Sequence, residues 1–515
     1  MRKTLPLISL PLISLPSLLL ALSGCDDGAN SDTSTPTPDA GIEQADATPT
    51  APDAEIAMGP QIRPAPESPQ RVGDPEAGWN YLIYGDYLGS GVPYDLYMEF
   101  IGPSSSNILG RTGEAAEIPA TFNVFDVDID GTPVKVVSGI TCLGCHASFI
   151  NGEFIPGLGD AFSDFTANGG FGSTGTFRAL DTLVTQRYGA DSPEWKAYEH
   201  ASLGVQGVGD TALVPFFGPN GAALLEKGLA AHRDPDDLTW IDEAQWDKVI
   251  DGSNGVGSDV PPWWNVKKKT ALYYSGMGRG DHTKLLMQIA LGGLRDAEHA
   301  AQILEHFDDV FAWLRELQPP AFPGEVDAAL AAEGMLVFES TCSGCHGTYG
   351  ATDADDTYPN VLVPFEIVGT DPTYAQQFIW GEEQVAWYND GWFGQALYPS
   401  EVIPEPVYLA PPLDGVWATA PYLHNGSVPT LAALLDSSTR PTHWRRADYN
   451  PRTAQYDLEQ LGWPHEAVTA EEMEAFGDAL TYDTTELGYS NEGHTFGDAL
   501  TDEERLALLE YLKTL

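Results

Sequence analysis

The sequence predicts a mainly α protein with two folded domains that follow a long N-terminal extension. Three observations carry this prediction: apolar residues at helical spacing in 298–317, 326–338 and 506–515, an alternating apolar pattern in 122–136, and a proline cluster that separates the helical segment 298–317 from the later ones. The helical segments are amphipathic, so each needs a partner face to bury. A chain of 515 residues is long enough for two or three such cores.

The domain junction is expected where prolines interrupt the helical pattern. Pro319, Pro320 and Pro323 follow the periodic segment 298–317 and cannot continue a helix. We therefore place an N-terminal domain at 71–320 and a C-terminal domain at 321–515. No short-period internal repeat is visible.

Two β-hairpins are expected in the N-terminal domain. The alternating segment 122–136 contains Asp130-Gly131, a dipeptide that favours a tight two-residue turn. Asn151-Gly152 predicts a second hairpin shortly after it. The N-terminal domain is thus more elaborate than the C-terminal one and carries longer loops.

Charge excludes several classes of partner. Asp and Glu number 75 against 25 Lys and Arg, a formal net charge of −50. Such a surface repels polyphosphates and anionic membrane faces, so we expect no nucleic-acid binding.

The first residues predict export. Arg2 and Lys3 precede an apolar run over 5–22 that ends in small residues before Cys25. The pattern resembles a bacterial lipoprotein signal, with residues 1–24 removed and Cys25 lipidated. The alternative is an ordinary signal peptide with a coincidental cysteine. Residues 25–70 are rich in Pro, Thr, Ala and Asp and are expected to be a disordered tether. The expected location is the periplasmic or cell-surface side of a bacterial membrane, inner or outer being left open.

The other four cysteines form two C-x-x-C-H motifs, and these six residues are Cys142, Cys145, His146, Cys342, Cys345 and His346. This spacing is typical of c-type haem attachment: the thiols bond the porphyrin and the imidazole binds the iron. A structural zinc site would need its cysteine pairs closer together, and a pair of disulfides is the other alternative. We predict two covalently bound haem c groups. Helices before the second motif and at the chain end resemble an ordinary cytochrome c domain, so the expected fold is two cytochrome c-like haem domains.

A longer resemblance begins in the segment 413–431, which reads LDGVWATAPYLHNGSVPTL. It resembles the signature of the di-haem cytochrome c peroxidase and MauG superfamily. Pro261-Pro262-Trp263-Trp264, the segment 278–282 and Arg440-Pro441 are more similar to the branch of the di-haem rubber oxygenases. The resemblance covers roughly 75–515.

In that superfamily the C-terminal haem relays electrons, and its sixth ligand lies shortly before the last helix. The matching residue here is His494, which implies a bis-histidine iron with His346. His424 in the signature is the main rival, and a loop position without a ligand role is the alternative for His494.

The resemblance leaves the N-terminal haem on His146 as the reactive one. Trp263 and Trp264 match a segment that bridges the haems, although tryptophan pairs are more often core residues. The cluster 267–269 of three lysines is either a solvated turn or a set of partners for haem propionates. Arg279 and His282 are the proposed proton donors near the reactive haem.

The resulting hypothesis is an oxidoreductase that activates peroxide or oxygen and receives electrons from a redox partner protein or a small donor. We identify no paired distal Gln and Glu of the peroxidase type. The alternatives are a tethered electron-transfer cytochrome without catalysis and oxidative cleavage of an apolar polyisoprenoid. Calcium is left open as an additional ion.

Overall fold

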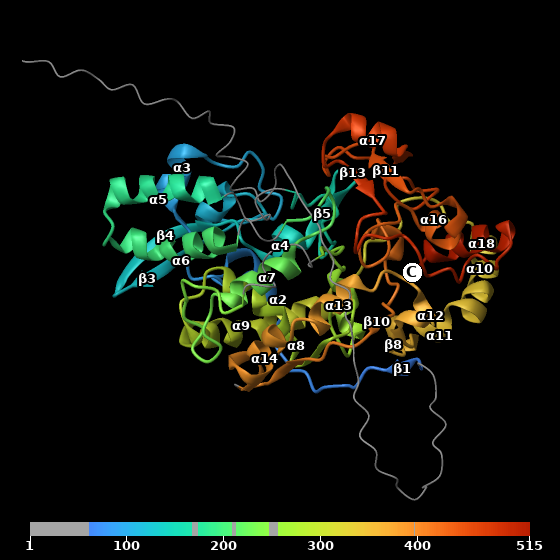
Figure 1. Ribbon diagram of the computed structural model, residues 1–515, viewed down its shortest axis with the longest axis horizontal. Helices are drawn as coiled ribbons and strands as arrows, with labels where there is room; N and C mark the ends of the chain where they lie inside the picture. Colours follow the sequence, from blue (N-terminus) through green and yellow to red (C-terminus); the bar gives the residue numbers. More distant parts are fainter. Residues whose placement is uncertain (1–60, 167–173, 209–212, 247–255, 396) are drawn as a thin grey trace, which may run out of the picture.

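The computed structural model describes residues 61–166, 174–208, 213–246, 256–395 and 397–515 (Figure 1). Helix accounts for 41% of the chain and strand for 15%, in small sheets, which confirms the mainly α prediction. The predicted signal peptide, Cys25 and most of the predicted tether lie outside the described residues. Among the helices that are described, none has the length and apolar character needed to cross a bilayer.

The described residues of the N-terminal half form eight α-helices, which are α2 (Pro75–Tyr84), α3 (Tyr94–Phe100), α4 (Cys142–Cys145), α5 (Thr174–Tyr188), α6 (Pro193–Val208), α7 (Ala222–Ala231), α8 (His282–Leu286) and α9 (Ala297–Glu316). Helix α9 is the one predicted from the apolar spacing. It begins at Asp296, whose side chain accepts the His299 N–H, and it ends before the predicted proline cluster. It packs on α2 so closely that a Cβ at Gly78 would lie 2.0 Å from the Asp309 carbonyl oxygen.

Both predicted hairpins are confirmed. Strand β3 (Asn123–Ile129) pairs antiparallel with β4 (Thr132–Ser138), and β2 (Val92–Pro93) extends the sheet beside β4. Asp130 and Gly131 have φ of 53° and 82°, the left-handed values that a tight hairpin turn requires. Strands β5 (Ala147–Ile150) and β6 (Glu153–Pro156) form the second hairpin, which starts directly after His146.

The C-terminal half contains nine described α-helices, which are α10 (Ala328–Thr341), α11 (Ser343–His346), α12 (Phe365–Val368), α13 (Thr373–Ile379), α14 (Glu382–Asp390), α15 (Trp392–Gln395), α16 (Leu431–Leu435), α17 (Ala470–Phe476) and α18 (Asp502–Leu512). The predicted helices before the second motif and at the chain end are α10 and α18, which cross side by side (Figure 1). The crossing is close because Gly334 lacks a side chain: a Cβ there would lie 1.9 Å from the Ala507 carbonyl oxygen.

Short elements complete the fold. The described 3₁₀ helices are η1 (Gly113–Glu117), η3 (Trp263–Lys268), η4 (Met287–Gly292), η5 (Asp353–Asp355), η6 (Val416–Ala418) and η7 (Ser437–Thr439). The remaining sheets are β1 (Arg63–Pro64), β8 (Val361–Pro364) and β10 (Val407–Leu409); β12 (His465–Ala467), β11 (His443–Arg446) and β13 (Thr481–Asp483); and β7 (Gly278–Gly280) with β9 (Ser400–Val402).

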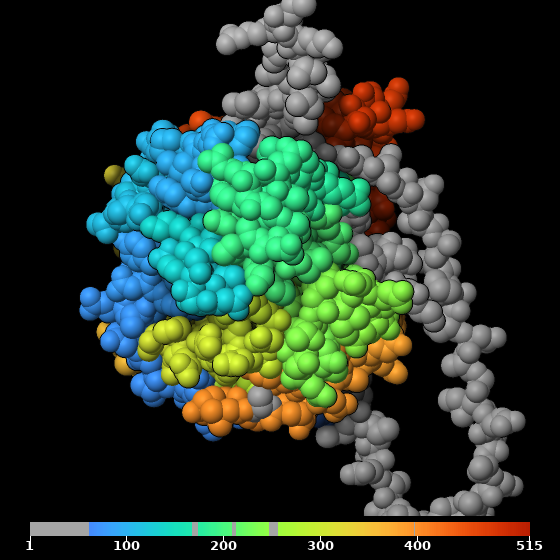
Figure 2. Space-filling view, turned by 90° about the vertical axis from the view of Figure 1, so that its left-hand side faces the viewer, coloured from blue at the N-terminus to red at the C-terminus, as the bar shows by residue number. Residues whose placement is uncertain are grey.

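The two halves of the chain are interwoven rather than separate. Strand β1, from the stretch expected to be tether, pairs with β8, and β7 of the first half pairs with β9 of the second. The Trp387 indole on α14 donates to the Arg233 carbonyl at 2.7 Å. Figure 2 shows residues of the second half, in orange, on the same face as green and yellow residues of the first. The proline cluster divides the sequence, but the packed cores extend across it.

Candidate haem-binding sites

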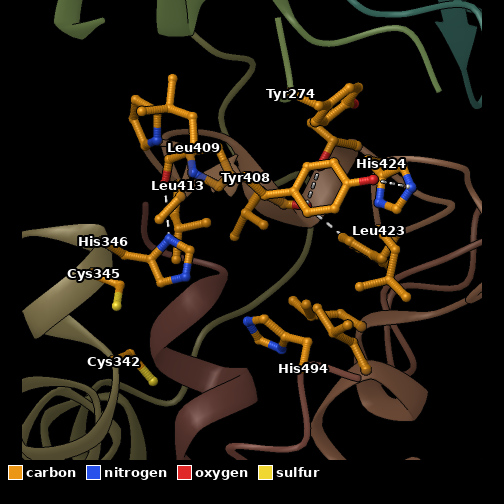
Figure 3. Close-up of a pocket in the computed structure, with 18 of the residues that line it drawn as sticks. Tyr274, Cys342, Cys345, His346, Tyr408, Leu409, Leu413, Leu423, His424 and His494 are labelled. Carbon is orange, nitrogen blue, oxygen red and sulfur yellow. Dashed lines mark hydrogen bonds between the residues drawn. The ribbon is translucent and has the colours of Figure 1, made fainter. Parts of the chain in front are cut away.

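The C-terminal C-x-x-C-H segment forms a helical turn at the end of α10. The N–H groups of Cys345 and His346 both donate to the Cys342 carbonyl, each at 3.1 Å. This winding brings both thiols and the imidazole to one cavity of about 270 Å³, which all three residues line (Figure 3). Two thiols and an imidazole on one turn are the donor set of a covalent haem c site.

The imidazole of His346 is held in one orientation. Its Nδ1 lies 2.8 Å from the carbonyl oxygen of Pro411, which follows β10. Burial lowers the pKa of His346, so the ring is neutral near pH 7. A neutral ring that donates from Nδ1 leaves the Nε2 lone pair available for a metal.

His494 enters the same cavity from a different segment (Figure 3). Its ring centroid lies 6.2 Å from that of His346, with 59° between the ring planes. Imidazole nitrogens bond first-row metals at about 2 Å. Two metal–nitrogen bonds, together with the distance from each ring centroid to its nitrogen, add up to the separation of the two centroids. One metal atom therefore fits between the two imidazoles. Burial lowers the pKa of His494 to about 4, and its Nδ1 has no hydrogen-bond partner among the described residues.

His424 is engaged elsewhere in the cavity. It stacks on Tyr408 with ring centroids 4.4 Å apart, and its Nε2 lies 3.1 Å from the Tyr408 hydroxyl. Because this nitrogen already has a polar partner, the geometry favours His494 over His424 as the ligand opposite His346.

The N-terminal motif repeats the same turn. The N–H of His146 donates to the Cys142 carbonyl at 3.0 Å. Burial raises the thiol pKa of Cys142 to about 12 and that of Cys145 to about 11, and it lowers the pKa of His146 to about 4. The Pro261 carbonyl raises the pKa of His146 as Pro411 does for His346, although His146 Nδ1 does not reach full hydrogen-bond geometry.

A structural repeat underlies this parallel. The segments that begin at Pro261-Pro262 and Pro411-Pro412 each continue into a bridged turn, Leu272 with Gly278 in one and Tyr422 with Val428 in the other. Both turns contain a left-handed non-glycine residue three positions before a left-handed glycine: Tyr273 and Gly276, and Leu423 and Gly426. The paired Pro-Pro dipeptides were the sequence signal for this repeat, which sequence reasoning missed.

Trp263 and Trp264 lie on η3 and contact different partners. Trp263 stacks on the His146 ring, with centroids 4.5 Å apart and 17° between the planes. Trp264 is completely buried and donates its indole N–H to the Asp414 carbonyl at 2.7 Å. The tryptophan pair therefore links the His146 turn to the segment that holds His346.

The three lysines after the tryptophans differ in their partners. Lys267 pairs with Asp353, and Lys268 pairs with both Asp356 and Asp414, each at 2.6 Å. Their charges are thus already compensated by carboxylates. Lys269 lines the cavity, and burial lowers its pKa to about 8. An anionic group bound in the cavity would stabilise the charged form of this lysine.

Arg279 and His282 are both buried, but they face different surroundings. Arg279 lies on β7 with its guanidinium 3.8 Å from Glu405, at the β7–β9 edge. His282 packs edge-on against Phe311 at 5.6 Å, and neither ring nitrogen has a hydrogen bond in the described part of the chain. Their role as proton donors stays a prediction.

Glu226 is a residue that sequence reasoning missed. It lies on α7, and burial raises its pKa to about 7. Its charge acts on Cys145 and on Tyr273, Tyr374 and Tyr388, so the carboxyl is within electrostatic range of the N-terminal motif. Asn220, just before α7, lies with its side-chain amide 3.5 Å from the Cys145 sulfur. The sequence signal that could have identified Glu226 is the charged pair Glu226-Lys227 inside an otherwise apolar helix.

The alternatives to haem find no support in the described residues. The four described cysteines are free thiols rather than disulfides. No cluster of three or more His, Cys, Asp or Glu side chains suited to a metal ion occurs in 61–515 outside the four undescribed gaps. Calcium, which the sequence leaves open, therefore has no carboxylate cluster to support it among these residues.

Comparison with known proteins agrees with the geometry of the C-terminal site. Residues 407–445 match the family described as RoxA-like, cytochrome c-like. Two curated proteins of Sinorhizobium fredii (strain NBRC 101917 / NGR234) are similar. Uncharacterized protein y4iJ is 33% identical over 39% of this chain and 41% of its own length. Uncharacterized protein y4iM is 27% identical over 50% of this chain and 64% of its own length.

The matches thus span less than two thirds of either relative. The matched family segment includes Pro411, which orients His346, and the signature residue His424. The chain therefore contains a RoxA-like, cytochrome c-like domain near its C-terminus, which implies haem c binding and a relationship to cytochromes of the di-haem rubber oxygenase type.

Proposed function

We propose that this protein is an exported di-haem c-type oxidoreductase. In this proposal the C-terminal haem is a bis-histidine electron-transfer centre, and the N-terminal haem activates peroxide or oxygen. The observation that carries the proposal is the facing pair His346 and His494 in the cavity that Cys342 and Cys345 line.

An iron with two imidazole ligands has no open position, which suits electron transfer rather than bond activation. The residues around the two rings are mostly apolar, and Lys269 offers a positive charge to an anionic group of a bound haem. His346 is fixed through Pro411, so little rearrangement is needed when an electron arrives or leaves.

The N-terminal site differs from the C-terminal one in the ring that its histidine contacts. The imidazole of His146 stacks on the Trp263 indole, whereas the imidazole of His346 faces the second imidazole of His494. In this proposal a haem held by Cys142, Cys145 and His146 would keep an exchangeable sixth position and would supply the redox chemistry.

Glu226 supports proton transfer at this site. With a pKa of about 7, its carboxyl both accepts and releases protons near neutral pH, as general acid–base catalysis requires. Peroxide cleavage needs a proton moved from one oxygen to the other, and a half-buried carboxyl on α7 can perform that transfer. Trp263 and Trp264 offer an aromatic path between the two sites.

The location and partners belong to the same proposal. The N-terminal segment supports export and a lipid anchor on Cys25, and the acidic surface favours a cationic electron donor. Cleavage of a polyisoprenoid is a narrower form of the proposal, favoured by the RoxA-like match. Oxygen uptake on addition of polyisoprene latex would test it.

The central test combines haem counting with ligand binding. Denatured protein should retain two covalent haems per chain, and a Cys142→Ser, Cys145→Ser variant should retain one. The native reduced protein should bind carbon monoxide at one haem and leave the other low-spin. If neither haem binds carbon monoxide, cyanide or peroxide, the non-catalytic electron carrier becomes the better account. A single covalent haem per chain would refute the di-haem proposal.

A further inference from the structure

Arg440 has an unusual set of partners near the cavity. A guanidinium carries five N–H donors in a planar fork. In Arg440 the donors reach five main-chain carbonyl oxygens: Nε reaches Ala433 at 3.1 Å, Nη2 reaches Leu434 at 3.0 Å and His494 at 3.2 Å, and Nη1 reaches Asn491 and Gly493 at 2.7 Å each. The side chain thus ties the end of α16 to the segment 491–494.

The segment 491–494 is held on its other side by backbone contacts. The N–H of His494 donates to the Val368 carbonyl at 2.7 Å. Gly493 approaches Gly369 so closely that a Cβ on Gly493 would lie 2.2 Å from the Gly369 carbonyl carbon. His494 itself has φ of 46°, a left-handed value that a side chain with a Cβ rarely adopts. The segment is therefore fixed from both sides in a conformation that is costly for histidine.

We infer that Arg440 is a positioning residue for the sixth ligand of the C-terminal haem, because it holds the His494 backbone where the imidazole faces His346. The inference rests on the proposed role of His494. Without the three carbonyl contacts to 491–494, the left-handed backbone loses the partners that offset its strain. The imidazole would then be in place for a smaller fraction of the time.

Lysine cannot replace this arginine. An ammonium is a point charge with three donors, and it cannot span carbonyls of two separate segments in one plane. Arg505 is the matched control. It also donates to main-chain carbonyls, those of Gly497 and Leu500, but it does not contact residues 491–494 in the described structure.

The experiment measures how readily an added ligand displaces His494. Arg440→Lys, Arg440→Gln, Arg505→Lys and His494→Ala are prepared as full-length holoprotein, and covalent haem content is checked after denaturation. Ferric protein is titrated with cyanide. The cyanide affinity of the C-terminal haem is read from the loss of the bis-histidine spectrum. Outer-shell changes at metal sites weaken ligation by about 10–100-fold. The cyanide affinity of the C-terminal haem should therefore rise by a similar factor in Arg440→Lys and Arg440→Gln, while the haem content stays unchanged.

The outcomes distinguish the positioning role of Arg440 from the ligand role of His494. If His494→Ala becomes high-spin while both Arg440 variants bind cyanide like the wild type, the positioning role is refuted and the ligand assignment stands. If His494→Ala stays low-spin, the ligand assignment fails and this inference fails with it. An equal effect of Arg505→Lys would mean that any loss of an arginine in this region destabilises the haem site. That result would also overturn the inference. If Arg440→Gln does not fold, Arg440→Lys alone decides.

Discussion

The Trp264 indole donates a hydrogen bond to the main-chain carbonyl of Asp414 at 2.7 Å, although the two residues belong to different halves of the chain. Trp263, the preceding residue, stacks on the ring of His146. Asp414 follows Pro411 closely, and Pro411 orients His346. The two C-x-x-C-H sites are therefore joined on their histidine sides by two adjacent tryptophans.

This contact predicts that Trp264→Phe lowers both stability and the rate of electron transfer between the haems. The change leaves the buried Asp414 carbonyl without its donor, which should cost about 1–3 kcal/mol of unfolding free energy. Denaturant unfolding measures the first effect, and stopped-flow reduction of the two haems measures the second. Trp195→Phe, on α6, is the control, because the ring contact of Trp195 is with Tyr198 and not with either motif. Unchanged transfer rates in both Trp263→Phe and Trp264→Phe would remove the tryptophans from the path.

Removing His494 should open the C-terminal haem. His494→Ala is expected to convert one low-spin haem to high-spin and to leave attachment through Cys342 and Cys345 intact, because only the sixth bond is lost. His424→Ala should keep the low-spin spectrum, since His424 is engaged with Tyr408. Absorption and electron paramagnetic resonance spectra distinguish the two. The reverse result would identify His424 as the ligand.

Glu226→Gln should change the pH dependence of both stability and activity. The folded carboxyl has its pKa raised to about 7, whereas an unfolded Glu titrates near about 4.3. The folded state therefore binds more protons between these values, and its stability falls as pH rises through them. The glutamine variant avoids this loss, so its stability relative to the wild type should be greater at pH 8 than at pH 5.

If Glu226 is the base that receives a proton from peroxide, the wild-type rate should rise with pH through about 7, and that rise should be absent in Glu226→Gln. Chemical denaturation and initial rates of peroxide consumption provide the two measurements. Glu503→Gln, at an exposed position of α18, serves as control. A wild-type rise that persists in Glu226→Gln would assign the proton transfer to another group.

Gly334→Ala should destabilise the crossing of α10 and α18. The new methyl group would lie 1.9 Å from the Ala507 carbonyl oxygen, so the helices must separate. Overpacking of this kind costs about 1–3 kcal/mol, measurable by thermal unfolding. Glu333→Ala, at an exposed position of the same helix α10, should have little effect. Equal stability of the two variants would show that the crossing is not tightly packed.

The sequence by itself determined the local features of this protein. The hairpin turns at Asp130-Gly131 and Asn151-Gly152, the long helix α9 and the pair α10 and α18 all follow from turn residues or apolar spacing within about twenty positions. The two C-x-x-C-H motifs likewise define their chemistry within five residues, because thiol and imidazole spacing is set by one helical turn.

Only the tertiary structure decided which distant groups meet. The facing rings of His346 and His494, the Pro411 carbonyl beside His346 and the electrostatic reach of Glu226 all depend on residues far apart in the chain. The pairing of β1 with β8 and the core residues that come from both halves of the chain are likewise contacts between distant segments. Such contacts arise from burying apolar faces of separate segments against each other, and no local pattern records which faces will be partners.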